Sequence, residues 1–242
     1  MPVNIQPHST WAQVYDLAYE HSFGRLYEQM TQTTIEVIES VARPPAPIVD
    51  FGAGTGRLSI LLAKLGYEIT AVDPCIEMLE QIKGKKCKGR LRINHSRMED
   101  FKTDKKYDVA LCVFTVLLYI LEEKSLSKSF TAAHAALNPD GILLIDIPSK
   151  MIFHGYSTSG NLIERSVSVI NQGGNIYRYS ENLKIISSSG EESTFSDSFP
   201  IRYWHPEQVM EALQKAGFTL EADVSDRFSG TGSNYYLMKR SQ

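Results

Sequence analysis

The chain has 242 residues, of which 43% are hydrophobic and 22% charged, with a formal net charge of −3 and a pI of about 6.1. These values are typical of one globular α/β domain with room for an insertion, and they give no general attraction to nucleic acid or anionic lipid. Its three cysteines, Cys75, Cys87 and Cys112, have no metal-binding or redox spacing, and we find neither a secretory leader nor an apolar run of membrane-spanning length. We therefore expect a cytoplasmic protein without a metal site.

The first 47 residues are predicted to be helical and rich in aromatic side chains. Residues 10–19 predict a short helix and residues 24–42 a longer one, with a buried stripe of Leu26, Met30, Val37 and Val41. Two interpretations of the aromatic residues stay open, a terminal helix anchored on the core or a lid over a ligand. The proline-rich residues 43–47 end this region.

A strand, a glycine turn and a helix follow one another from residue 48. The apolar strand at 48–51 runs into Gly52, Gly54 and Gly56, and from Thr55 the leucines take up helical spacing. Such glycines let a ligand lie against the backbone at a helix N-terminus, although a turn that only packs would look the same. The dinucleotide-binding pattern would need a further glycine where this chain has Arg57.

An acid, Asp50, stands two residues before the first glycine. This spacing, Asp-x-Gly-x-Gly-x-Gly, resembles the first motif of the class I S-adenosylmethionine (SAM)-dependent methyltransferases. The resemblance implies an α/β fold with a Rossmann-like, doubly wound, mostly parallel seven-stranded sheet. It also implies SAM as the cofactor and S-adenosylhomocysteine as its product. The cofactor would lie against Asp50, Gly52, Ala53, Gly54 and Gly56.

The second strand is predicted at residues 68–72 and closes with Asp73, 19 residues after Gly54. An acid at this distance can accept hydrogen bonds from both hydroxyls of a ribose, and the alternative is a solvated strand-end carboxylate. The next residues resemble the second motif of the same family, which implies cofactor contacts for Pro74 and Met78. The basic residues 83–90 that follow could contact phosphates, but we favour a solvated connection.

Residues 96–101, after a third strand at 91–94, resemble the family loop that brackets adenine. This implies cofactor contacts for Arg97, Met98 and Glu99. The family usually has an acid where Arg97 stands, and a guanidinium cannot accept a hydrogen bond from the adenine amine. Glu99 or a backbone carbonyl is then the expected acceptor.

Residues 107–114 form a nearly continuous apolar run, typical of a central parallel strand. Ligands bind at the carboxyl ends of such strands, so we expect the cofactor site to include Val113, Phe114 and Tyr119. The Asn/Asp-Pro-Pro-Tyr motif of enzymes that methylate base amines or protein glutamine does not stand here. A helix at 122–137 and a fifth strand at 142–147 follow.

An antiparallel β insertion is predicted after strand five. Three alternating segments near 162–170, 176–186 and 193–203 are joined by two hairpin turns and have one wet face. The insertion would cover a substrate or form a homodimer contact. Similar insertions occur in small-molecule methyltransferases, including those acting on amino sugars. The final helix from residue 205 and two strands near 219–224 and 234–239 resemble the family's closing elements, with the last strand antiparallel.

The predicted units are a helical lid (1–47), a SAM-binding core (48–148), the insertion (149–204) and a C-terminal helix with the closing strand pair (205–242). Methyl transfer from a sulfonium is an in-line displacement that depends on orientation and can be assisted by a base. Tyr15, which resembles an early tyrosine that closes over the cofactor in small-molecule methyltransferases, and His154 are the catalytic candidates. The substrate-binding candidates are Tyr19, Arg25, Tyr156 and Tyr203.

The resemblance predicts methyl transfer to nitrogen or oxygen of a small molecule. Two alternatives remain open, a methyltransferase acting on RNA or protein and a SAM-binding protein that does not transfer methyl groups. Membrane and nucleic-acid partners are not expected.

Overall fold

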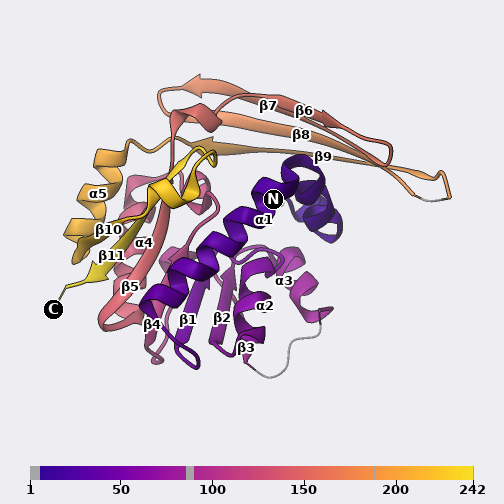
Figure 1. The fold of residues 1–242 in the computed structure, drawn as a ribbon. Helices are drawn as coiled ribbons and strands as arrows, with labels where there is room; N and C mark the ends of the chain where they lie inside the picture. The colour runs from indigo at the N-terminus through magenta and orange to yellow at the C-terminus, as the bar shows by residue number, and fades with distance from the viewer. Residues whose placement is uncertain (1–5, 86–89, 188, 242) are drawn as a thin grey trace.

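A computed structural model describes residues 6–85, 90–187 and 189–241 of the chain. Within these ranges, a seven-stranded sheet has the order β10-β11-β5-β4-β1-β2-β3 (Figure 1). Strands β1 to β5 run parallel, while β11 is antiparallel to both β5 and β10. The strands are β1 Pro47–Phe51, β2 Glu68–Asp73, β3 Leu91–His95, β4 Tyr107–Cys112, β5 Leu137–Pro148, β10 Phe218–Asp223 and β11 Ser233–Arg240. This confirms the predicted sheet and its antiparallel closing strand.

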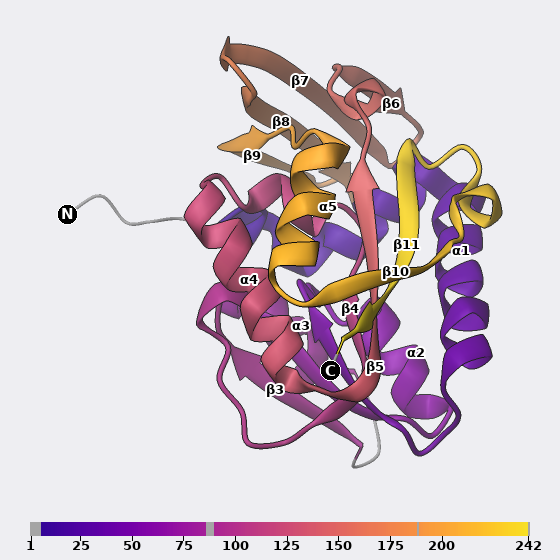
Figure 2. The same ribbon diagram turned by 90° about the vertical axis from the view of Figure 1, so that its left-hand side faces the viewer.

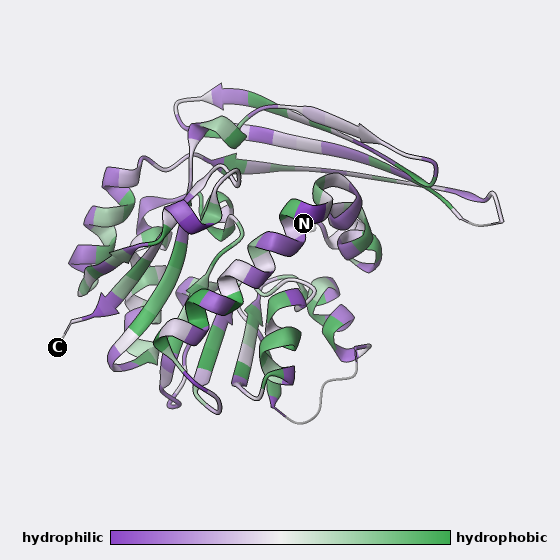
Figure 3. Ribbon diagram, in the orientation of Figure 1, coloured by the Kyte–Doolittle hydropathy of each residue, from purple (hydrophilic) through white to green (hydrophobic). Residues whose placement is uncertain are grey.

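Helices cover both faces of this sheet (Figure 2). One face carries α1 Tyr15–Val41, α2 Arg57–Lys64 and α3 Ile76–Lys83, and the other carries α4 Glu123–Ala136 and α5 Pro206–Lys215. The central strands between the two helical layers are apolar along most of their length (Figure 3). Because both faces of the sheet are buried, apolar burial on each side stabilises the fold.

Short 3-10 helices occupy several connections, namely η1 Ser9–Val14, η2 Met98–Asp100, η3 Val116–Tyr119, η4 Lys150–Ile152 and η5 Ser225–Phe228. The N-terminal region therefore differs from the prediction. Residues 9–14 form η1, and α1 begins earlier than expected and is interrupted at Gly24, where φ is +44° and ψ −119°. A glycine adopts this conformation at low cost, which is why the interruption falls there.

In the predicted buried stripe of α1, Val37 is buried and Leu26 and Met30 are half-buried, so the prediction fails only at the exposed Val41. The residues of this helix that are buried after Gly24 are Thr31, Thr34, Ile35, Val37 and Ile38, and Val41 is 36% exposed. Threonines are polar and did not enter the predicted stripe. Here each hydroxyl donates to a carbonyl one turn earlier, that of Tyr27 or Met30, so burial leaves no polar group unpaired.

A second, antiparallel sheet lies beyond the carboxyl ends of the parallel strands (Figure 1). Its strands are β6 Tyr156–Ser159, β7 Ile163–Gly173, β8 Ile176–Ile186 and β9 Glu192–Arg202, in that order. The predicted insertion is confirmed, with β6 as an additional strand too short to show alternation. Apolar clusters join the inner face of this sheet to η3 and to the segment formed by η1 and the start of α1.

Some sequence predictions lie outside the described residues. These are the part of the basic run at residues 86–89, which includes Cys87, and Ser188 in the second hairpin turn. Among the described helices, none combines the length and the apolar character that a membrane span requires.

Candidate active site

The glycine turn connects β1 to α2 through three residues with positive φ. These angles are +75° at Gly52, +56° at Gly54 and +76° at Gly56. A Cβ added at Gly52 would overlap Val116, and one at Gly56 would collide with side chains of α2 and α3, so packing requires these two glycines. A Cβ at Gly54 would meet only the Met78 methyl group, at 3.9 Å. The backbone at Gly54 is therefore open on the side where a ligand would lie.

The carboxylate of Asp73, at the end of β2, closes this turn. Its Oδ2 accepts a 2.9 Å hydrogen bond from the Gly54 N–H, and its Oδ1 accepts one of 2.8 Å from the Cys75 N–H. Burial raises the pKa of Asp73, while these two hydrogen bonds oppose the shift. A carboxylate has about four lone-pair positions, so both oxygens can still accept from ribose hydroxyls. Pro74 follows directly, with its carbonyl 2.9 Å from Nε2 of His95.

The carboxylate of Asp50 is buried behind the glycine turn and does not face the open side of the turn at Gly54. Its Oδ2 accepts a 2.6 Å hydrogen bond from Ser59 Oγ of α2. Burial raises the pKa of Asp50 to about 6, although the Ser59 hydrogen bond opposes the shift. The contact joins β1 to the first turn of α2, so Asp50 supports the position of the glycine turn.

The predicted adenine side lies between α3 and η2. Met78 and Met98 are buried, and Tyr15 and Ala12 of the N-terminal segment pack in one cluster with Met78. Arg97 is exposed, with Nη1 3.9 Å from Oε1 of Glu99. The guanidinium therefore turns to the neighbouring carboxylate.

Strained backbone follows the central strand β4. Phe114 and Thr115, neither of them glycine, have φ of +64° and +68°. Such conformations persist where their surroundings over-determine them, and they are enriched at functional sites. Here Asp146 of β5 accepts a 3.0 Å hydrogen bond from the Thr115 N–H, and the Arg57 guanidinium lies 4.3 Å from the Phe114 ring centre. This turn, which begins at the buried Val113, gives the site a rigid floor at the carboxyl edge of the sheet.

The N-terminal segment is tied to the glycine turn by Asp16. Its Oδ1 accepts a 2.5 Å hydrogen bond from Thr55 Oγ1, and its Oδ2 forms a 2.6 Å ion pair with Lys85 Nζ. Lys85 belongs to the basic run, so this lysine is paired within the chain. Beside Asp16, the rings of Tyr15 and Tyr19 stack with 4.2 Å between centroids, and burial raises the pKa of Tyr15 well above its usual value.

A buried charged cluster under the second sheet was missed by the sequence analysis. Arg165 of β7 and Glu181 of β8 are each 1% exposed, with Nη2 2.9 Å from Oε2. His8 lies against them, with Nδ1 2.8 Å from Glu181 Oε1 and Nε2 2.9 Å from the Tyr119 hydroxyl. The sequence did contain a signal for this cluster. Arg165 and Glu181 each occupy an inward-facing position of their strand, because the residues two positions before and after them are apolar or aromatic.

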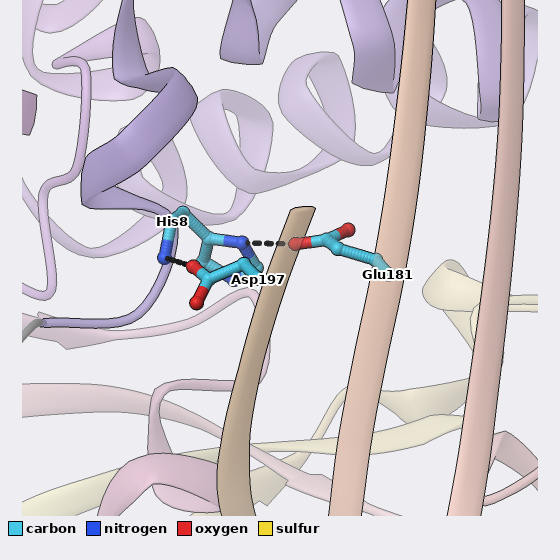
Figure 4. A group of neighbouring side chains, drawn as sticks. All are labelled: His8, Glu181 and Asp197. Carbon is cyan, nitrogen blue, oxygen red and sulfur yellow. Dashed lines mark hydrogen bonds and ion pairs between the residues drawn. The ribbon is translucent and has the colours of Figure 1, made fainter. Parts of the chain in front are cut away.

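His8, Glu181 and Asp197 bring three potential metal-ligand atoms within 4.8 Å of one another (Figure 4). Each side chain already has partners, because Asp197 accepts from the His8 N–H at 2.7 Å and Glu181 accepts from Arg165. The Arg165 cation also balances the Glu181 charge. We therefore describe this group as a hydrogen-bonded network and not as a metal centre.

The structure brings some of the predicted catalytic and substrate residues together and leaves others apart. Tyr19 and Tyr156 lie beside the Arg165 guanidinium, at 4.5 and 5.7 Å from ring centre to Cζ. Tyr203 packs in a different place, against Phe153 and His205.

Two candidates are exposed to solvent instead of joining the cluster. His154 is in the loop after η4, where its Nδ1 lies 2.5 Å from the Met151 carbonyl, and Arg25 follows the interruption of α1. Loop position and helix phase set these two orientations, and neither could be read from residue type.

These residues fit SAM. The open backbone at Gly54 leaves room for a ligand, and the Asp73 carboxylate stands next to it as a ribose acceptor. The fold and the site together define a Rossmann-like methyltransferase.

Comparison with known proteins agrees with this class. Residues 48–141 match the family described as "Methyltransferase domain". The Bacillus subtilis protein YqeM, whose name places it among the methyltransferases, is 26% identical over 227 residues, which cover 89% of this chain and 88% of YqeM.

Two solved structures share the fold over nearly the whole chain. A SAM-dependent methyltransferase from Clostridium acetobutylicum has a TM-score of 0.81 at 17% identity, covering 96% of this chain and 99% of that one. SAM-bound CalS10, an amino pentose methyltransferase from Micromonospora echinaspora, has a TM-score of 0.77 at 19% identity, covering 100% and 99%. Residues 48–141 of the present chain thus belong to this methyltransferase domain family, and the comparisons together support a class I SAM-dependent methyltransferase with SAM as its cofactor.

Proposed function

We propose that this enzyme transfers the methyl group to a nitrogen or oxygen of a small molecule. The acceptor would lie between the N-terminal segment, Tyr119 and the inner face of the β6–β9 sheet. The observation that carries the proposal is the position of this sheet, which packs on η3 and on the N-terminal segment across the carboxyl edge of the parallel strands. A site covered in this way suits a small acceptor better than a folded RNA or protein.

The chemistry of the covered region also supports a small polar acceptor. Aromatic rings from several elements surround Arg165 and Glu181, so a bound molecule would meet apolar faces with a few fixed polar groups. CalS10, which shares the fold and is an amino pentose methyltransferase, acts on a substrate of this class. The residues of the chain would hold the acceptor in line with the methyl group that bound SAM supplies.

The proposal assigns a role to each part of the chain. Residues 1–47, the first five of which lie outside the described residues, would act as the lid, and residues 48–148 as the SAM-binding core. Residues 149–204 would cover the substrate, and residues 205–242 would close the sheet. A homodimer contact through the β6–β9 sheet would have to use its outer face or its edges. We also propose a cytoplasmic location, which the free buried thiols of Cys75 and Cys112 support.

A turnover screen tests this function. Purified protein with SAM is given a panel of small amines, amino sugars and hydroxylated metabolites, and in parallel total RNA and a protein extract, and formation of S-adenosylhomocysteine is measured. We expect product with at least one small acceptor. Turnover with RNA or protein alone would overturn the proposal in favour of a macromolecular substrate. Tight SAM binding without any turnover would indicate a binding protein.

A further inference from the structure

His8 is held in a conformation that its surroundings impose. Its φ is +63°, in the left-handed region that residues other than glycine seldom occupy. Three contacts with distant parts of the chain fix it: the backbone N–H donates to Asp197, Nδ1 lies 2.8 Å from Glu181, and Nε2 lies 2.9 Å from the Tyr119 hydroxyl. Both ring nitrogens of a buried histidine are thus engaged, one by a carboxylate and the other by a phenol.

Two buried charged side chains, Glu181 and Arg165, lie on the Nδ1 side of His8. Burial acts to raise the pKa of Glu181, but the hydrogen bond and charge of His8 and the Arg165 cation outweigh it and lower the pKa, so this carboxylate stays ionised. Arg165 contacts Glu181 Oε2 through Nη2 at 2.9 Å and Nε at 3.3 Å and balances its charge. An imidazole with its single proton on Nδ1 would donate that proton to Glu181 and present its Nε2 lone pair to the Tyr119 hydroxyl.

Tyr119 stands between this network and the cofactor side of the site. It ends η3, which follows the strained turn after β4. Burial raises the pKa of Tyr119 well above its usual value, with smaller contributions from Tyr19, Glu181 and Asp73, and Arg165 opposes the shift. The phenol therefore keeps its own proton and can release it only while it receives another.

We propose that Tyr119, His8 and Glu181 form a proton relay that removes the proton of the methyl acceptor. The inference rests on the proposed function, because the proton that the relay removes is that of a nitrogen or oxygen acceptor. It adds that the acceptor enters the site still protonated, as an ammonium or a hydroxyl group.

The reaction balances as follows. As the acceptor gives up its proton, the electron pair that this frees would form the bond to the methyl carbon that bound SAM supplies, and the carbon–sulfur electron pair would return to sulfur. The acceptor proton passes to the Tyr119 oxygen while the Tyr119 proton passes to His8 Nε2, and Glu181 stabilises the resulting imidazolium. Tyr119 is the catalytic residue, and His8 and Glu181 are positioning residues that act through it.

The competing explanation is that His8 only fastens the N-terminal segment to β8. Nuclear magnetic resonance of the free protein with 15N-labelled histidine separates the two without any acceptor. The relay requires the neutral tautomer with the proton on Nδ1 near pH 7.5, and Tyr119→Phe should shift the Nε2 resonance of His8. A proton on Nε2, or a doubly protonated ring throughout pH 6.5–8, would overturn the relay. His134→Gln, on the far side of the sheet against Phe218, identifies an unrelated histidine signal.

Kinetics with an acceptor from the turnover screen supply the second test. We expect Tyr119→Phe and His8→Gln to lower kcat by roughly 100-fold or more at pH 7, within the range for lost proton transfer, with SAM affinity by calorimetry changed less than threefold. With an amine acceptor the loss should shrink as the pH rises, because an acceptor that is already deprotonated needs no relay. Added imidazole should partly restore His8→Ala.

The outcomes distinguish the relay from the proposed function. Full activity of both variants beside an active wild type would refute the relay and leave the function standing. A loss that is equal at every pH and accompanied by weaker SAM binding would also refute it, in favour of the fastening role. An inactive wild type would end the proposed function and the relay with it. Tyr236→Phe, on β11 away from this network, is the matched control and should behave as wild type.

Discussion

Asp73 is the single side chain on which we expect SAM affinity to depend most. Its carboxylate is fixed by the Gly54 and Cys75 N–H groups and keeps lone pairs for a ribose. A hydrogen bond to a charged acceptor contributes roughly 1.5–3 kcal/mol, so Asp73→Ala should weaken SAM binding at least tenfold in calorimetry. Wild-type affinity in this variant, with the fold intact by circular dichroism, would contradict the assignment.

Arg97→Ala is the matched comparison in the adenine loop. The side chain is exposed and turns toward Glu99, so its removal should change SAM affinity little. A large loss would show that the guanidinium moves to the cofactor when SAM binds.

Asp146 gives a prediction about pH. Burial raises its pKa from an ordinary 3.8 to about 6, and the Ser233 and Thr115 hydrogen bonds only partly oppose this. The folded chain therefore binds the Asp146 proton more tightly than the unfolded chain does. As the pH rises from the unfolded pKa of 3.8 to the folded pKa of about 6, this difference lowers the free energy of unfolding. One pKa unit corresponds to about 1.4 kcal/mol, so the cost at neutral pH is on the order of 3 kcal/mol at most.

Asp146→Asn removes this titration while its amide oxygen can still accept from the Thr115 N–H. The difference in Tm, variant minus wild type, should therefore increase between about pH 4 and pH 6.5 in thermal denaturation. Asp223→Asn is the opposite control, because hydrogen bonds from Ser225 lower the pKa of that exposed carboxylate. A difference for Asp146→Asn that stays constant with pH would show that its pKa is not raised.

At the scale of elements, the N-terminal segment decides how the site closes. Tyr15 stacks on Tyr19 and packs beside Met78, which supports both the lid and the packing interpretation. As a lid, Tyr15→Phe should keep the fold and lower kcat/KM, and Tyr15→Ala should also weaken SAM binding. If Tyr15 only packs, Tyr15→Ala will lower Tm and leave the turnover per folded molecule unchanged. Phe23→Ala, at the 36% exposed ring two turns further along α1, is the control for lost aromatic packing.

At the scale of the whole molecule, ligand binding should stabilise the fold selectively. SAM at a hundredfold excess over its Kd should raise the free energy of unfolding by about 2.7 kcal/mol, which for a chain of this size raises Tm by roughly 5–10 °C. NAD at the same concentration should not raise Tm. Gly54→Val should remain folded with a lower starting Tm, because φ there is +56°, and should lose the SAM-induced rise. A larger rise with NAD than with SAM would contradict the cofactor assignment.

Local patterns in the sequence determined most of the fold. The glycine spacing after β1, the acid that ends β2 and the apolar run of β4 each depend on residues within one short segment. Strand and helix periodicity therefore predicted the individual strands of the main sheet and three of the four strands of the second sheet, while the family resemblance supplied their assembly into a seven-stranded sheet. The family resemblance added the cofactor, which the family match supports.

Only the tertiary structure decided which side chains meet in the covered site. His8 and Glu181 are 173 residues apart in sequence, and His8 and Tyr119 are 111 apart, so no local pattern joins them. Arg165 and Glu181 stood in the inward phase of their strands, but their burial became understandable only once each was seen to pair with the other. His154 and Arg25 had suitable chemistry, and the fold turned them to solvent. Periodicity depends on neighbours along the chain, whereas an active site depends on contacts that the packing of distant elements creates.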